Sequence, residues 1–107
     1  MLFYRLDENK QLVKLGQNDN WANVDHREQV AFNEPIIGTI VSTVFLGYDT
    51  SGINYNNPIC FETYVASENP NVFSGVTQRY STWQEAVAGH KKWCNRAIDE
   101  ALGDRQR

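Results

Sequence analysis

The sequence predicts an α+β fold, an antiparallel sheet of four to six strands with one long C-terminal helix packed on one face. Two segments rich in β-branched and aromatic residues, 36–46 and 58–66, predict central strands. A helix-start signature, followed by apolar residues at helical spacing, predicts the helix over 83–102. Because 107 residues leave little room for a second hydrophobic core, we expect a single domain over 1–107.

The N-terminal third predicts less regular structure. Segment 2–15 has two short apolar runs on either side of the polar residues 7–10, which suits a hairpin or an extended strand and turn. Segment 16–30 is polar, and it either caps a short helix around Trp21 or forms a loop. Pro35 is expected to end whatever precedes it, since proline supplies no amide for a central ladder.

The clearest strand, 36–46, carries apolar groups on both faces. One face holds Ile40, Ser42, Val44 and Leu46, and the other holds Val41, Thr43 and Phe45. A central strand has this pattern when both sides are covered, or when one face enters a partner. The strand over 58–66 has a dry face and a mixed face. The dry face holds Ile59, Phe61, Thr63 and Val65, and the mixed face holds Cys60, Glu62, Tyr64 and Ala66.

A turn-rich loop over 47–57 joins these two strands, and residues 76–80 predict a further strand before the helix. Thr82 and Glu85 form a capping box at the helix start, and Gly103 is expected to end the helix. One side of this helix is predicted to pack. It holds Trp83, Val87, His90, Cys94, Ala97, Ile98 and Ala101.

His90 lies inside this apolar stripe, and two interpretations of it stay open. The first is a packed histidine with one ring nitrogen bonded to a backbone carbonyl or a carboxylate. The second is a general base or ligand beside Glu62 or Tyr80. If the helix lies across the mixed face of the sheet, Glu62 and His90 would form a pair.

Composition and motifs argue against several classes of function. The net charge is −3 and no basic cluster occurs, so nucleic-acid binding is not indicated. The chain has no signal-peptide pattern and no apolar run long enough for a membrane span, so we expect an intracellular protein with two free cysteines, Cys60 and Cys94. Nucleophile-elbow, phosphate-loop, dinucleotide and zinc-helix motifs are all missing, and the His and Cys spacing suits no metal; we expect no catalytic set, no metal and no cofactor.

Three blocks of the sequence carry a resemblance to a family. The blocks "VSTVFLGYD" (41–49), "FETYVA" (61–66) and "RYSTWQEAVAGH" (79–90) resemble, in order and spacing, those of small uncharacterised proteins encoded by bacteriophages and prophages. The resemblance implies a phage or prophage origin and a place in the host bacterial cytoplasm, but no reaction. Thr50 stands where relatives often have a histidine, and Tyr64–Ala66 stands where they have Met-Val-Phe.

Because small phage accessory proteins commonly bind and block a host component, the resemblance implies a non-enzymatic inhibitor of a host protein complex, such as a CRISPR-type antiphage defence system. A homodimer is a further expectation. One alternative is a module that sequesters a nucleotide-like signal, and another is a small enzyme using Glu62, Tyr80 and His90. The candidate binding residues are Tyr48, Asp49, Tyr55, Glu62, Arg79, Tyr80 and His90. A ligand site or an active site would bring the last four together in a pocket.

Overall fold

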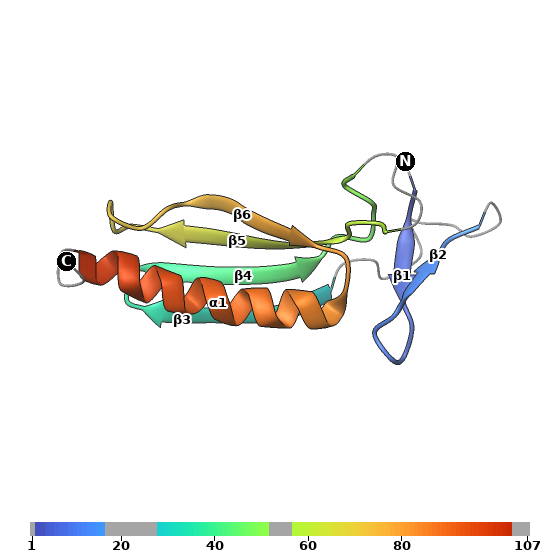
Figure 1. Ribbon diagram of the computed structural model, residues 1–107, viewed down its shortest axis with the longest axis horizontal. Coiled ribbons are helices and arrows are strands. Elements are labelled where there is room, and N and C mark those ends of the chain that lie inside the picture. The colour runs from blue at the N-terminus through green and yellow to red at the C-terminus, as the bar shows by residue number, and fades with distance from the viewer. Residues whose placement is uncertain (1, 17–27, 52–56, 104–107) are drawn as a thin grey trace.

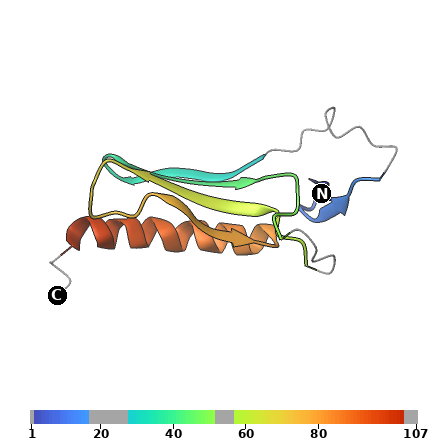
Figure 2. The ribbon, with the colours of Figure 1, turned by 90° about the horizontal axis from the view of Figure 1, so that it is seen from above.

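A computed structural model of the chain describes residues 2–16, 28–51 and 57–103. It confirms the α+β fold. A four-stranded antiparallel sheet in the order β3-β4-β5-β6 carries the C-terminal helix α1 on one face, and β1 and β2 form a separate two-stranded sheet (Figures 1 and 2). No helix in these residues has the length and apolar character that crossing a membrane requires.

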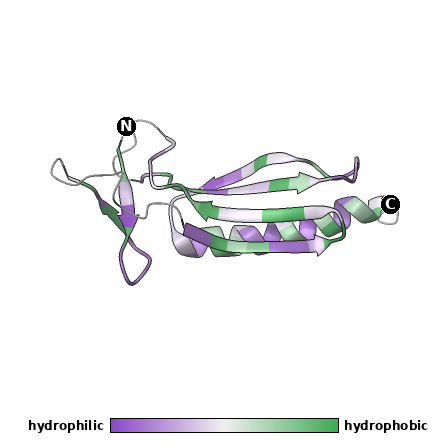
Figure 3. Cartoon of the chain, turned by 180° about the vertical axis from the view of Figure 1, so that it is seen from behind, coloured by the Kyte–Doolittle hydropathy of each residue, from purple (hydrophilic) through white to green (hydrophobic). Residues whose placement is uncertain are grey.

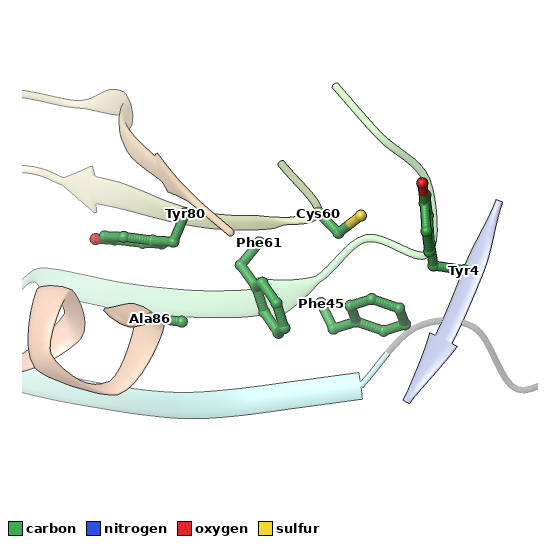
Figure 4. Close-up of a cluster of buried hydrophobic side chains, with 6 residues drawn as sticks. All are labelled: Tyr4, Phe45, Cys60, Phe61, Tyr80 and Ala86. Atoms are coloured by element: carbon green, nitrogen blue, oxygen red, sulfur yellow. The ribbon is translucent and has the colours of Figure 1, made fainter. Parts of the chain in front are cut away.

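The predicted N-terminal hairpin is confirmed. β1 (Tyr4–Leu6) pairs antiparallel with β2 (Leu12–Lys14), beyond one end of the larger sheet (Figure 1). The Tyr4 N–H donates to the Gly47 carbonyl at 3.0 Å, and the Tyr4 side chain packs with Phe45 and Cys60 (Figure 4). The short helix considered around Trp21 falls in 17–27, outside the residues that the structure describes.

The strand β3 (Glu28–Ile36) was not predicted, and Pro35 lies inside it instead of ending the preceding segment. Among the described strands, β3 is at the edge of the sheet and pairs with β4. A proline near the end of an edge strand costs the sheet few hydrogen bonds between strands. The pairing with β4 also shifts register between Asn33 and Ile36, next to this proline.

The next strand starts later than the sequence predicted. β4 (Thr39–Phe45) begins at Thr39 because Ile36 belongs to β3, and the chain reverses through Ile37 and Gly38. Gly38 has a φ of 83°, a left-handed conformation that glycine adopts without strain. The two following strands, β5 (Phe61–Ser67) and β6 (Gly75–Tyr80), confirm the predicted pair within a few residues.

The helix α1 (Trp83–Leu102) has the predicted bounds. Thr82 Oγ1 accepts the Glu85 N–H at 3.0 Å, and the Glu85 carboxylate accepts the Thr82 N–H at 3.1 Å, which is the predicted capping box. Gly103, at a φ of 58°, ends the helix and donates its N–H to the Asp99 carbonyl.

The buried side of α1 differs in part from the predicted stripe. Val87 was expected to pack, but 47% of it is exposed. The buried residues of the helix are Ala86, Gly89, His90 and Ala97. Small side chains at this interface let the helix approach the sheet closely: a Cβ atom on Gly89 would overlap the Tyr80 ring.

The helix covers the dry face of the sheet, which we call the inner face. Inward residues of β4 and β5 are buried there: Val41, Thr43, Phe45, Phe61, Thr63 and Val65. Two apolar clusters fill this layer. One holds Tyr4, Phe45, Cys60, Phe61, Tyr80 and Ala86 (Figure 4), and the other holds Val41, Val65, Val72 and Ala97. Cys60 was predicted on the mixed face, but it precedes β5, outside the strand alternation, and is fully buried.

Candidate functional site

A continuous chain of side-chain hydrogen bonds crosses the layer between the sheet and α1. Tyr80 Oη bonds Thr63 Oγ1 at 2.9 Å, and Thr63 Oγ1 bonds Thr43 Oγ1 at 2.6 Å. Thr43 Oγ1 bonds His90 Nδ1 at 2.8 Å, and His90 Nε2 bonds Asn33 Oδ1 at 2.8 Å. Each of the four strands of the larger sheet and the helix contributes one residue. This chain of hydrogen bonds, which we call the relay, therefore connects all five elements.

The chemistry of the end groups sets the direction of the relay. Asn33 Oδ1 can only accept, so His90 Nε2 carries the proton and the neutral Nδ1 accepts from Thr43. Each hydroxyl then donates to the next group, from Tyr80 through Thr63 and Thr43 to the imidazole. Burial lowers the pKa of His90 below its usual 6.5 and raises the pKa of Tyr80, which keeps both groups neutral at pH 7.

The predicted pair of Glu62 and His90 is wrong, because the helix does not lie on the mixed face. Glu62 points to the opposite side of the sheet, where its carboxylate accepts from Arg79 Nε at 3.2 Å. Arg79 and Tyr80 are successive residues of β6, so their side chains lie on opposite faces. Glu62, Arg79, Tyr80 and His90 therefore form two separate groups and do not line one pocket.

Asp49 lies at the end of the sheet next to the N-terminal hairpin and is almost fully buried. Its Oδ1 accepts from the Ser51 N–H (2.9 Å), the Ser51 hydroxyl (2.6 Å) and the Ile59 N–H (2.9 Å), so it joins the two ends of the loop. Burial acts to raise the pKa of Asp49, but these hydrogen bonds outweigh it and the pKa is lowered. Tyr48 forms a β-bridge to the N-terminal segment, and Tyr55 lies outside the described residues.

The two cysteines are free, as expected, and are held as thiols. Burial raises the pKa of Cys60 to about 12 and also raises the pKa of Cys94. A protonated thiol is a poor nucleophile and a poor metal ligand. Within residues 2–16, 28–51 and 57–103, no three histidine, cysteine, aspartate or glutamate side chains gather closely enough to hold a metal ion.

The side of the sheet away from α1, which we call the outer face, is turned toward the viewer in Figure 3 and carries a row of exposed side chains. Phe32, Ser42, Tyr64 and Val76 are directly paired across the four strands, so they lie in one row. The exposed fractions are 57% for Phe32, 47% for Tyr64 and 42% for Val76. No described element packs over this row.

Sequence reasoning missed the central residues of the relay. Thr43 and Thr63 were placed on the correct faces, and a polar residue at an inward strand position signals a buried hydrogen bond. Asn33 and Phe32 carried no usable signal, because β3 itself was not predicted.

No family model, no curated protein and no solved structure matches the chain. The resemblance to phage proteins therefore stays a prediction from the sequence, and the function has to be inferred from the residues themselves.

The neutral His90 makes the stability of the fold depend on pH. Unfolding returns the pKa of His90 to about 6.5, so below that pH the unfolded chain binds a proton that the folded chain does not. The free energy of unfolding should therefore fall as the pH drops from about 7 to about 5. Urea titrations at a series of pH values measure this slope.

A variant of the imidazole tests this pH dependence. His90→Gln should flatten the slope. Asp49 changes the free energy of unfolding only near and below its usual pKa of 3.8, so its effect does not overlap the pH range in which His90 acts. A slope that survives His90→Gln would contradict the neutral, buried imidazole.

Proposed function

We propose that this protein is a non-enzymatic accessory protein of phage type that binds a host protein complex, such as a CRISPR-type antiphage defence system, and inhibits it. The outer face of the sheet is the binding surface. The phage origin and the kind of host target rest on the sequence resemblance. The surface rests on the exposed apolar row of Phe32, Tyr64 and Val76.

This row is the single observation that carries the binding function. Exposed apolar side chains that lie side by side mark interaction sites, and aromatic residues are enriched where proteins meet. The outer face has both features, since the exposed Phe32 and Tyr64 lie on either side of the small Ser42, and Val76 is paired with Tyr64.

The other two functions have less support from the geometry. A nucleotide pocket lined by both Arg79 and Tyr80 would need side chains that the sheet holds on opposite faces. An enzyme using Glu62, Tyr80 and His90 would need the Glu62 carboxylate beside the imidazole, but the two ring nitrogens of His90 are bonded to Thr43 and Asn33, and Glu62 lies on the opposite face of the sheet.

Plating assays test the proposed inhibition. The protein is produced in bacterial strains that each carry one antiphage defence system, and the plating efficiency of a sensitive phage is counted. We expect the wild-type protein to raise plating in at least one strain. Tyr64→Glu places a charge in the centre of the apolar row and should reduce this gain by about tenfold or more.

The matched control is Val87→Glu, because Val87 on α1 has the same exposed fraction as Tyr64, 47%. Val87→Glu should inhibit like the wild type, and circular dichroism should show that both variants are folded. Equal inhibition by Tyr64→Glu and the wild type would remove the outer face from the function. Failure of the wild type in every strain would contradict the inhibitory role itself.

A further inference from the structure

One end of the outer face is hollowed next to the β3–β4 turn. The depression has a volume of about 360 Å³ and is lined by Glu34, Gly38, Ile40, Ala66, Ser67 and Glu68. Ile40 and Ala66 are cross-strand partners on the outer face, so they form an apolar floor next to the row that contains Tyr64. The depression is therefore continuous with the proposed binding surface.

The carboxylates of Glu34 and Glu68 lie at the edge of this apolar floor. Glu34 accepts the Gly38 N–H at 3.0 Å, and a Cβ atom on Gly38 would lie 3.4 Å from Glu68 Oε2, so both acids are near the turn. Within the described part of the chain, neither forms an ion pair. At the other end of the face, by contrast, Glu62 is paired with Arg79.

We propose that this depression accepts a lysine or arginine side chain of the partner protein. The aliphatic stem of such a side chain would lie on Ile40 and Ala66, and its cation would meet Glu34 and Glu68. The inference rests on the proposed function, because it names the chemistry of the partner that binds the outer face. The partner segment combines apolar side chains for the Tyr64 row with a basic residue at one end.

The charges of the outer face favour this occupant over a second copy of the chain. A second copy would bring the same two unpaired acids to the interface, and its Arg79 is already neutralised by Glu62. Like charges brought together at an interface weaken association, while a basic segment gains from both acids. The net charge of −3 adds to this preference.

Selection of peptides tests the proposal without knowledge of the host partner. Random linear peptides displayed on yeast are selected on the immobilised wild-type protein, and peptides that no longer bind Tyr64→Glu are kept as outer-face binders. We expect these peptides to carry lysine or arginine beside apolar residues. Fluorescence anisotropy should show about tenfold weaker binding to the double variant Glu34→Gln/Glu68→Gln, and a smaller difference at high salt.

Glutamine keeps the acceptor for the Gly38 N–H, so the double variant should fold like the wild type. Replacing the basic residue of a peptide by glutamine should reproduce the loss of affinity and make the double variant equal to the wild type. Outer-face peptides without basic residues, basic peptides that bind the double variant equally well, or no outer-face binders at all would each overturn the proposal.

Sedimentation velocity gives the remaining outcome. A wild-type dimer that Tyr64→Glu dissociates would assign the outer face to a second copy and would also overturn the proposal. If the plating assay shows no inhibition, the peptide measurements still test which residues the outer face binds. The proposed function and the proposed chemistry of the partner can therefore be contradicted separately.

Discussion

Replacement of Gly89 by alanine is expected to lower the free energy of unfolding by about 2 to 3 kcal/mol, because the added methyl group would overlap the Tyr80 ring. In an exposed helix the same change would raise stability by about 1 kcal/mol, since glycine is a poor helix former. The sign of the effect therefore reports how closely α1 lies against β6. Urea unfolding of the wild type and the variant measures it.

A second substitution separates this overlap from other causes. Leucine at position 80 lacks the outer ring atoms and the hydroxyl that the new methyl group would meet. In a Tyr80→Leu background, Gly89→Ala should therefore be neutral or slightly stabilising, a departure from additivity of about 2 kcal/mol or more. Equal destabilisation in both backgrounds would contradict the close approach.

Thr43→Val should destabilise the protein by about 3 kcal/mol, although valine has nearly the same shape as threonine. The hydroxyl of Thr43 is fully buried and is bonded on both sides. Without it, His90 Nδ1 loses its donor and the Thr63 proton loses its acceptor. Each buried polar group left without a partner costs about 1 to 3 kcal/mol.

The neighbouring residue of the same strand provides the control. Ser42 is on the outer face, and its hydroxyl is partly exposed and accepts only a 3.3 Å hydrogen bond from Gln29. Ser42→Ala should change the free energy of unfolding by no more than about 0.5 kcal/mol. If Thr43→Val were equally mild, the relay would contribute little to stability.

The strand β3 could not be predicted from its own residues, and the reason is physical. The sequence of β3 is polar because an edge strand can present Gln29 and Glu34 to water. Pro35 is tolerated there because no further strand among the described residues pairs with this side of β3. Its strand state depends on pairing with β4, not on its own residues. Local propensity therefore missed β3 while it predicted β4 and β5, whose β-branched residues suit a central strand on their own.

The choice of the inner face could not be predicted from alternation alone, because both faces of β4 carry apolar residues. The helix supplies His90 and small residues at its centre, and these match the hydroxyl groups of Thr43 and Thr63. Glu62 and its partner Arg79 then remain on the side that water reaches. This matching of polar groups appears only when the two layers are brought together.

By itself, the sequence determined the bounds of α1 and the presence, though not the bounds, of the N-terminal hairpin and of the two central strands, since each depends on interactions within a few residues. The capping box joins Thr82 and Glu85, which are three positions apart. Only the tertiary structure decided the relay, the contact of Gly89 with Tyr80 and the exposed outer face. His90 and Asn33 are 57 positions apart, and their hydrogen bond exists because helix and sheet pack at one particular depth and register.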